Sequence, residues 1–322
     1  MFESFKRLSF RHKNNKSLYY LKNYVSLLIP SFFYRISLER ELKQRKGMDM
    51  NQVYHRVDYY NKLSGDPTPL QEALALSEHK LGKKFKVYFF DTHIISRYFN
   101  QRLKLNVCYG DVTHIPDSPS IVKSRPINGK NENSVVLKLE KIRHFLFLND
   151  SHCFHDKKNS LIGRSKINQP HRARFMELYF NHPLCDVGGV STHSKYPQWI
   201  RPRLTLEEHL NYKFILCLEG HDVASNLKWV MSSNSLAVMP VPTYETWFME
   251  GTLIPDYHYV SIKDDYSDLE EKLRYYIEHE DEALAIIEHA HEYIVPFKNK
   301  RQEKLISLLV LRKYFEQTGQ TI

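Results

Sequence analysis

One aspartate follows an apolar run in a position suited to proton transfer. Residues 103–109 (LKLNVCY) predict a buried strand, and Asp111 comes directly after it, at the start of a loop rich in cations. A carboxylate held at a strand end can act as a general base. A strand-ending cap is the alternative for Asp111, and Asp117, in a DSP turn, is better explained as a turn former.

A second group of residues has the types that bind a diphosphate. The apolar run at 214–218 predicts a strand, Gly220 allows a turn after it, and we expect a helix to begin near Ala224. Backbone N–H groups at a helix start favour phosphate, and Ser225 and Lys228 add a hydroxyl and a cation. An ordinary strand-to-helix connection is the alternative.

Two further segments could contribute to the same site. Residues 163–174 (GRSKINQPHRAR) predict a cationic loop that opens a helix, in which Arg164 and Arg172 could bind phosphate as planar forks. A solvated charge run is the alternative. Glu245 follows a strand expected at 236–241, where open α/β sheets bind ligands, and could bind two sugar or ribose hydroxyls. It could instead be an acid at a helix start beside a buried Trp247.

The elements that position these residues alternate between strand and helix. This order predicts an α/β protein with mainly parallel sheets, and 322 residues suit two domains. We expect a basic segment at 1–46, an acceptor-side domain at 47–165, and a nucleotide-sugar-binding domain at 166–322 with a terminal helix. The expected strands are 85–90, 103–109, 145–148, 214–218, 236–241 and 257–262. The expected helices are 68–81, 172–180, 223–232, 269–278, 282–294 and 300–315.

The positive charge of the chain is concentrated at its start. The formal net charge is +9, and residues 1–46 hold 11 Lys/Arg against 3 Asp/Glu. The stretch at 24–34 (YVSLLIPSFFY) is broken by proline and is shorter than the roughly 20 residues of a membrane span. It also does not resemble a signal peptide. We interpret it as an interfacial segment for an anionic membrane surface. The alternative is a core helix with a solvated basic flank, in which Leu27, Leu28, Phe32 and Phe33 pack inward.

Other classes of protein find little support in the sequence. The four cysteines are scattered without a CxxC pair, so a zinc site is not expected and the cytoplasm is the default compartment. The basic charge could suit nucleic acid, but no zinc-finger, RRM or helix-turn-helix signature accompanies it. We therefore expect no nucleic-acid partner.

Several segments, in this order, resemble glycosyltransferase family 90. They are YKFILCLEG, VASNLKWVMSSNSLAVM and HYVSIKDDYSDLEEKL, the last close to the family signature HYVPVK-x-DLSDL. GDVTHIPDSPSIVKSRPI and QPHRARFMELYFNHPLCDVG are similar to the bacterial LpsA-like lipopolysaccharide transferases of that family. Its other branches include the Rumi protein O-glucosyltransferases and the fungal capsule xylosyltransferase. The resemblance covers roughly residues 85–295.

The resemblance implies a fold and a reaction. The fold would be GT-B-like, with two Rossmann-like domains facing a cleft. The reaction would be an inverting transfer of a hexose, glucose or galactose, from a UDP-sugar to a lipid-linked lipopolysaccharide or lipooligosaccharide core acceptor. It would use no metal and no other cofactor, and the enzyme would be peripheral on the cytoplasmic face of the inner membrane. A protein or capsule glycosyltransferase, or a non-catalytic scaffold of the same family, is the alternative.

The resemblance also assigns roles to residues. Asp111 is the position that best matches the family's catalytic base. Gly163, Arg164 and Arg172 occupy ground similar to the family's FRG element and the arginine after it, with a different spacing. Lys228 matches the family, whereas Asn226 stands where other members have arginine. This departure puts the identity of the donor sugar in doubt.

Overall fold

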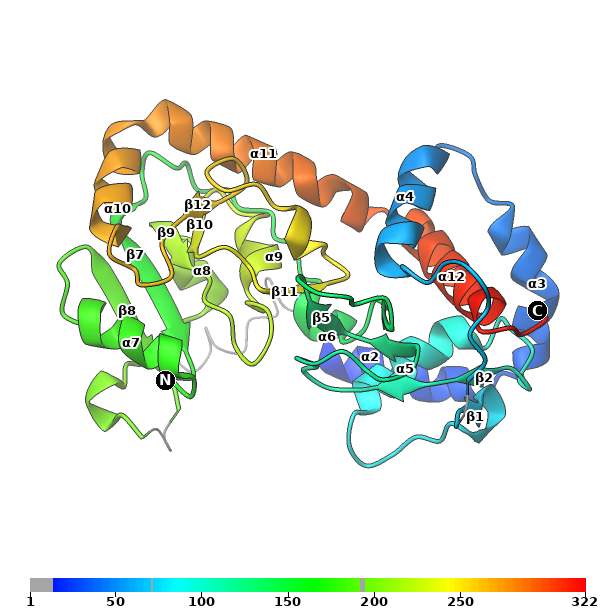
Figure 1. Cartoon of the computed structure of the whole chain (residues 1–322). Coiled ribbons are helices and arrows are strands. Elements are labelled where there is room, and N and C mark those ends of the chain that lie inside the picture. The colour runs from blue at the N-terminus through cyan, green and yellow to red at the C-terminus, as the bar shows by residue number, and fades with distance from the viewer. Residues whose placement is uncertain (1–13, 71, 192–194) are drawn as a thin grey trace. The chain divides into compact units, whose positions relative to one another are not determined.

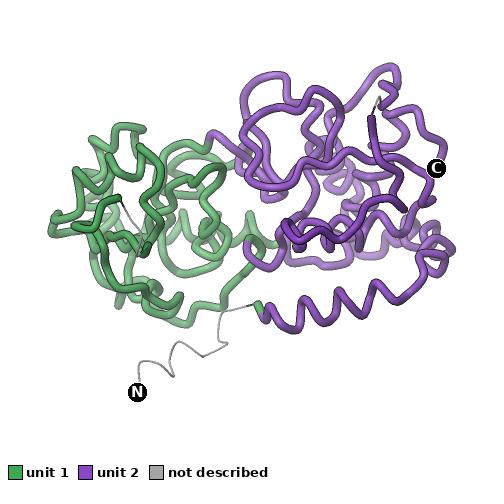
Figure 2. Tube along the Cα trace, turned by 90° about the horizontal axis from the view of Figure 1, so that it is seen from below, with its two compact units in different colours: residues 1–14, 144–242, 252–295 green, residues 15–143, 243–251, 296–322 purple. Residues whose placement is uncertain are grey.

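The computed structural model describes residues 14–70, 72–191 and 195–322 (Figure 1). These residues form a mixed α/β protein, which confirms the predicted class, whereas the GT-B-like arrangement stays a prediction. The chain divides into two compact units (Figure 2). Of the described residues, unit 1 comprises 14, 144–242 and 252–295, and unit 2 comprises 15–143, 243–251 and 296–322.

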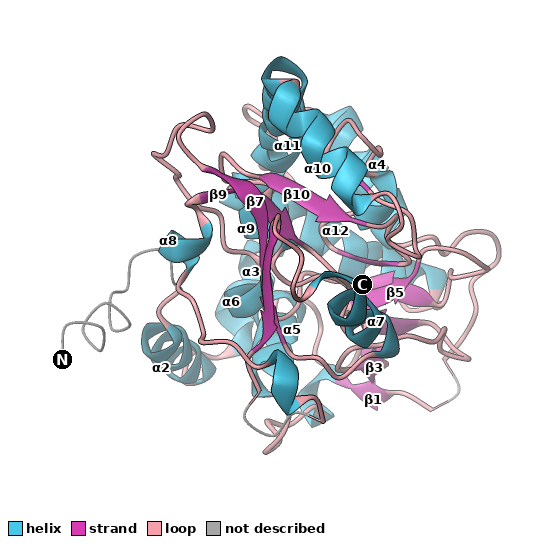
Figure 3. Cartoon of the chain, turned by 90° about the vertical axis from the view of Figure 1, so that its left-hand side faces the viewer, coloured by secondary structure: helices cyan, strands magenta, loops and turns pink. Residues whose placement is uncertain are grey.

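Unit 1 is built on a sheet of five parallel strands. They are β7 (Lys158–Ser165), β8 (Cys185–Gly189), β9 (Tyr212–Leu216), β10 (Leu236–Met239) and β12 (Val260–Ser261). Their spatial order is β12-β10-β9-β7-β8, and Figure 3 shows β7, β9 and β10 side by side. The chain passes from β7 outward to β8, then returns to the other side of β7 and continues through β9. In a sheet wound in this way, ligands bind at the carboxyl ends where the direction reverses, here between β7 and β9.

Helices pack on this sheet through apolar side chains. Those of unit 1 are α7 (Pro170–Tyr179), α8 (Leu206–His209), α9 (Leu227–Val230), α10 (Leu269–Glu278) and most of α11 (Glu280–Lys298), with a 3₁₀ turn η2 (Pro197–Trp199). Buried positions of α10 recur at helical spacing, at Leu269, Leu273 and Tyr276. They join α7, α11 and the strands in one core. Helices α7 and α10 therefore pack on the described part of this sheet through one shared core.

Unit 2 contains shorter strands and more helices. A parallel sheet has the order β3 (Val107–Cys108), β4 (Ser120–Val122), β6 (Ser134–Val136). Two antiparallel pairs join β1 (Leu74–Ala75) to β2 (Lys104–Leu105) and β5 (Ser124–Pro126) to β11 (Tyr244–Thr246). The helices are α2 (Lys16–Leu27), α3 (Ser31–Leu42), α4 (Met50–Tyr60), α5 (Lys86–Ser96), α6 (Lys141–His144) and α12 (Lys300–Gln317), with 3₁₀ turns η1 (Leu76–Glu78) and η3 (Glu250–Thr252).

The terminal helix α12 is part of the core of unit 2. It packs against α3, α4 and α5, and Leu305, Leu308 and Tyr314 are fully buried. Its Glu303 forms an ion pair with buried Arg56 at 2.7 Å. The helix predicted at 300–315 is confirmed, and it belongs to a different unit from the five-stranded sheet.

The unit boundaries differ from the predicted domains. Residues 158–165 were placed in the domain at 47–165, and no strand was expected there, yet they form β7, which pairs in parallel with β8 and β9 and so belongs to unit 1. Residues 243–251 and 296–322, expected in the domain at 166–322, belong to unit 2, because β11 pairs with β5 and α12 packs on α4. Pairing between distant segments, which a linear reading does not contain, sets these boundaries.

Several predicted elements are confirmed and others are wrong. Strands β9 and β10 and helices α7, α10, α11 and α12 lie where periodicity predicts them. The expected strand at 85–90 lies in α5 apart from Phe85, and no strand forms at 145–148, where the Leu148 amide donates to Ser232 Oγ at 2.7 Å. The helix expected at 68–81 is replaced by β1 and η1, because the Leu76 amide pairs with Leu103 O at 2.8 Å. Hydrogen bonds to distant residues therefore determine the structure of the segments at 145–148 and 68–81.

The apolar stretch near the N-terminus is not core. Leu28, Phe32 and Phe33 are exposed and Leu27 is half-buried, so the alternative in which all four pack inward is wrong. Residues 1–13 of the basic segment lie outside the described residues. Among the residues described, the chain has no helix of sufficient length and hydrophobicity to cross a bilayer.

Candidate active site

One arginine links the loops that follow β7 and β9. Arg172, in the first turn of α7, donates from Nε to Glu219 O at 2.8 Å, from Nη2 to Leu218 O at 2.8 Å and from Nη1 to Lys166 O at 3.0 Å. Lys166 follows β7, and Leu218 and Glu219 follow β9. A single guanidinium therefore fixes the two loops on either side of the place where the winding of the sheet reverses.

Neighbouring residues complete this arrangement. Nε2 of His171 lies 2.8 Å from the carbonyl oxygen of Glu219. A side-chain carbon on Gly220 would lie 3.5 Å from Nη2 of Arg172, in ordinary contact. The structure thus brings together Arg172 and Gly220, which the sequence analysis selected from separate segments. Their contact shows a positioning role for Arg172, and its expected contact with phosphate stays a prediction.

The helix expected after Gly220 is much shorter than predicted. Helix α9 has four residues and begins at Leu227, not near Ala224. A single turn has little dipole to attract a phosphate. Asn226 donates from Nδ2 to Leu216 O at 2.9 Å, so the residue that replaces the family arginine ties down the end of β9. Ala224 and Lys228 are buried and Ser225 is half-buried, and their part in donor binding stays a prediction.

Helix α7 is the longer helix that starts at this edge of the sheet. It has ten residues, begins at Pro170 directly after the loop that follows β7, and has no acidic residue in its first turn. Its positive dipole end therefore lies beside the loops that Arg172 holds. The sequence analysis assigned this role to the other loop. The proline at the first helical position was the signal that could have located the helix start.

Gly163 and Arg164 are strand residues, which corrects the expected cationic loop. Both lie in β7, where a Cβ on Gly163 would come within 3.1 Å of Leu216 Cδ2. Arg164 donates from Nη2 to Asp186 Oδ1 at 2.7 Å and from Nε to Pro202 O at 3.0 Å. Burial alone would raise the pKa of Asp186, but hydrogen bonds from Arg164 and Tyr212 lower it. The Arg164–Asp186 pair is structural.

A hollow of 630 Å³ lies at the same edge of the sheet, beyond β10 and β12. Val241 follows β10, and Ser261, Ile262 and Lys263 lie at the end of β12. The remaining lining residues are mostly charged: Pro255, Asp256, Asp264, Asp265, Asp268 and Lys272. Carboxylates and ammonium groups in this arrangement can hydrogen-bond sugar hydroxyls. Over the described ranges, no group of three or more His, Cys, Asp or Glu is placed to hold a metal ion.

Asp111 lies at the carboxyl end of the parallel sheet of unit 2. It follows β3 through Gly110, whose φ of 116° requires glycine. Lys123, just after β4, places its Nζ 2.5 Å from Asp111 Oδ1. Lys123 is buried and Asp111 is partly exposed. The sheet therefore orients the candidate base, a contact that the sequence analysis did not predict.

Glu245 is a buried carboxylate in β11, and its expected part in donor binding stays a prediction. Its Oε1 is 2.8 Å from Nε of Arg125, and the Tyr59 hydroxyl donates to its Oε2. Both carboxylate oxygens therefore have protein partners. The alternative, in which Glu245 is an acid at a helix start, is wrong because Glu245 lies in a strand. Trp247 is buried as predicted.

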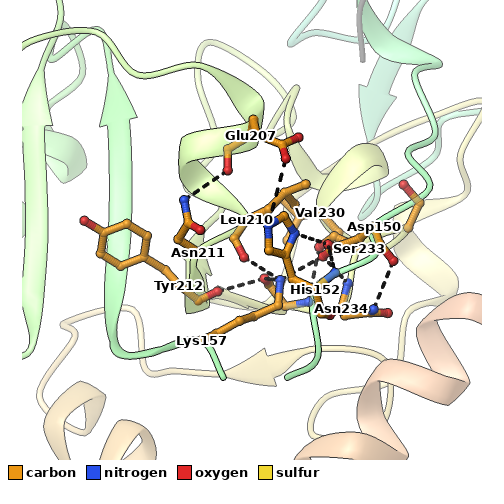
Figure 4. Close-up of polar contacts among 12 residues, drawn as sticks. Asp150, His152, Lys157, Glu207, Leu210, Asn211, Tyr212, Val230, Ser233 and Asn234 are labelled. Atoms are coloured by element: carbon orange, nitrogen blue, oxygen red, sulfur yellow. Dashed lines mark hydrogen bonds and ion pairs between the residues drawn. The ribbon is translucent and has the colours of Figure 1, made fainter. Parts of the chain in front are cut away.

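A polar cluster missed by the sequence analysis lies at the amino ends of the strands (Figure 4). Asp150 Oδ2 is 2.7 Å from Lys157 Nζ, which also donates to Ser235 Oγ at 2.9 Å. The Asn234 amide donates to Asp150 Oδ2 at 2.9 Å. Lys157 directly precedes β7, and Ser235 directly precedes β10. Because ligands bind at the opposite edge of such a sheet, this cluster is structural.

Comparison with known proteins shows the family of the chain. Residues 163–304 match the family described as Glycosyl transferase family 90. O-glucosyltransferase LpsA of Dichelobacter nodosus is 40% identical over 304 residues, which cover 94% of this chain and 95% of that protein. Uncharacterized protein 027R of Frog virus 3 (isolate Goorha) is 31% identical over 118 residues, 35% of this chain and 12% of that protein. With 40% identity over nearly the full length of a named transferase, the chain belongs to glycosyltransferase family 90 and is a glycosyltransferase.

Proposed function

We propose that the enzyme transfers a hexose, glucose or galactose, from a UDP-sugar to the core of a lipid-linked lipopolysaccharide or lipooligosaccharide. The observation that carries this proposal is the similarity, over nearly the whole chain, to a protein named O-glucosyltransferase LpsA. The activity in the name of that relative favours glucose as the donor sugar. Asn226, bonded to the end of β9, is the reason to keep galactose as a second candidate.

In this proposal Asp111 is the general base. Its carboxylate accepts the proton of the acceptor hydroxyl while that oxygen attacks the anomeric carbon. The bond from the anomeric carbon to the β-phosphate oxygen breaks on the opposite face, and UDP leaves with its electron pair. The product therefore has the inverted configuration. Lys123 supports this role, because it holds one carboxylate oxygen of Asp111 while the Asp111 side chain stays partly exposed.

The donor in this proposal binds at the carboxyl edge of the unit 1 sheet. The start of α7 and Lys166 would face the diphosphate, and Arg172 would hold the loops that form the crevice. Cationic groups stabilise the charge that develops on departing UDP, so the proposed reaction needs no metal or other cofactor. Ser225 would add a hydroxyl. Lys228 is buried, so its contact with phosphate would require the loop at 217–226 to move.

The proposed location is the cytoplasmic face of the inner membrane, with the enzyme peripheral. A lipid-linked acceptor lies in the membrane, so a transferase gains from being held at its surface. The proposed partners are the UDP-sugar, the lipid-linked oligosaccharide and the anionic lipid surface, without nucleic acid. The basic N-terminal segment motivates this location.

The stereochemistry of transfer tests the proposal. The enzyme would be incubated with UDP-glucose or UDP-galactose and a truncated lipooligosaccharide, and the anomeric configuration of the product read by NMR. The proposal expects inversion with one of the two donors. Retention would contradict the role of Asp111 as base, and the absence of UDP release with every donor and acceptor would favour a non-catalytic scaffold.

A further inference from the structure

The hairpin formed by α2 and α3 turns apolar side chains outward. We define its apolar face by Leu21 and Val25 of α2, Leu28 in the turn, and Phe32, Phe33 and Ile36 of α3. All six are exposed, Leu28 to 82% and Ile36 to 67% of the full side-chain range. Exposed apolar residues scattered singly are ordinary, but six of them on two consecutive helices and the turn between them indicate a binding surface.

Polar groups hold the hairpin from its inner side. The Tyr19 hydroxyl donates to the buried carboxylate of Asp91 in α5 at 2.9 Å. Arg97, directly after α5, is buried and donates from Nη2 to Ser26 O at 2.9 Å. Its guanidinium lies 3.7 Å from the centre of the Tyr34 ring. The hairpin is therefore seated on α5 through polar contacts, and the outward direction of its apolar face is fixed by specific bonds.

The charges along α2 and the first half of α3 are all positive, whereas the end of α3 carries Glu39, Arg40 and Glu41, of which Glu41 pairs with Lys304 at 2.8 Å. Between residues 16 and 36 the charged residues are Lys16, Lys22 and Arg35, all exposed, with no acid among them. Such a face complements an anionic lipid surface. A second copy of this chain would meet it with the same positive charges, so an isologous dimer through the face is disfavoured by repulsion. Among these occupants, charge selects the membrane.

We propose that the α2–α3 hairpin inserts its apolar face into the interfacial layer of an anionic bilayer. The inference deepens the proposed membrane location and rests on it. The basic residues attract the protein to the surface, and the apolar side chains then enter the boundary between head groups and acyl chains. Salt screens the first contribution and not the second. Binding therefore persists in part when salt removes the electrostatic attraction.

Vesicle binding by paired variants tests this insertion. The full chain would be sedimented with phosphatidylcholine vesicles containing phosphatidylglycerol, at low salt and at about 1 M NaCl, where the Debye length is about 3 Å. The variant F32S/F33S is expected to bind at least about tenfold more weakly at both salt concentrations, because less apolar surface leaves water. The variant K16Q/K22Q/R35Q is expected to lose affinity only at low salt.

The control is L284S/V295S, which changes two exposed apolar residues of α11. It should bind vesicles like the unmodified chain. Tryptophan fluorescence of F33W should shift to shorter wavelength on binding and be quenched by lipids brominated in the acyl chain. Brominated acyl chains quench only a tryptophan that has entered the bilayer, so quenching and vesicle sedimentation should be lost together in variants that do not bind.

Several results would overturn the inference. Equal vesicle binding by F32S/F33S and the unmodified chain would do so, as would complete release by salt. A concentration-dependent dimer that F32S/F33S dissolves, seen by sedimentation velocity without vesicle binding, would assign the face to a second copy. Vesicle binding that is seen only after removal of residues 1–13 would assign the apolar face to those residues as its occupant. Hexose transfer to a delipidated acceptor, measured on the same preparations, reports on the proposed function separately.

Discussion

The ammonium nitrogen of Lys123 lies 2.5 Å from Oδ1 of Asp111, and the two residues differ sharply in exposure. The Lys123 side chain is 2% exposed, whereas that of Asp111 is 32% exposed. A buried cation thus fixes the orientation of a carboxylate that solvent and substrate can reach. This relationship makes Asp111 the best candidate for proton transfer in unit 2.

Replacing Asp111 by asparagine should remove the base and leave the donor site intact. We expect Asp111→Asn to lower kcat at least about 100-fold, with UDP affinity by calorimetry little changed. Asp117→Asn is the matched control, since Asp117 is an exposed acid of the following turn, and it should retain activity. Near-normal turnover of Asp111→Asn would refute the assignment, and Asp117 would be tested next as the base.

Arg172 should determine how well the crevice beside β7 and β9 binds UDP. Arg172→Ala removes hydrogen bonds to carbonyls on both loops. We expect UDP binding to weaken by about 1–3 kcal/mol, the range for contacts with a charged donor. Arg174→Ala, on the same helix and exposed, should change UDP affinity by less than about 0.5 kcal/mol. Equal UDP affinities for all three proteins would place the donor site elsewhere.

The proposed reaction should not depend on a divalent metal. Transfer measured in EDTA should equal transfer in untreated buffer, because cations of the chain are proposed to stabilise the leaving diphosphate. Manganese and magnesium, added back separately, should not raise the rate. Activity that disappears in EDTA and returns with either metal would contradict this part of the proposal.

Asp150 should matter for stability and not for donor binding. Asp150→Asn breaks a buried ion pair with Lys157, which costs about 3–5 kcal/mol in the free energy of unfolding. UDP affinity should be unchanged, because the cluster lies at the amino ends of the strands. The exposed Asp156→Asn is the control and should unfold like the unmodified chain. Equal unfolding free energies for the two variants would show that the pair contributes little.

The same residue gives this unit a sensitivity to acid. Burial would raise the pKa of Asp150, but hydrogen bonds from Lys157, His152 and Asn234 outweigh it and lower the pKa. Its stabilising contribution is therefore complete above the ordinary carboxylate pKa and is lost as pH falls through the lowered value. Asp150→Asn should flatten the acid limb of the stability curve, which denaturant unfolding at several pH values would measure.

Sequence periodicity predicted some elements correctly and missed others, among them β7 and β8. Strands β9 and β10 are short continuous apolar runs bounded by polar turns, and α10 repeats apolar residues at helical spacing, so local pattern suffices. The segments at 68–81 and 145–148 are decided by partners far along the chain, such as Leu103 and Ser232. No local pattern encodes those partners.

The candidate site was predictable by residue type more than by role. Arg172 and Gly220 were selected from separate segments, and the structure places them close together. The partner of Glu245, Arg125, lies on a strand 120 positions earlier in the sequence, so this contact was not predicted. Arg164 was expected in a loop, but it lies in β7, a strand that was not predicted. For Glu245 and Arg164, strand pairing that the linear sequence does not reveal determines where the charged group lies.

The measurement that tests the central claim most directly is the mass of the product. The purified enzyme would be incubated with a truncated lipooligosaccharide and a panel of UDP-sugars, beside Asp111→Asn. The account predicts an acceptor heavier by one hexose residue with UDP-glucose or UDP-galactose, and almost no such product from the variant. An acceptor of unchanged mass with every UDP-sugar, or equal product from Asp111→Asn, would contradict it.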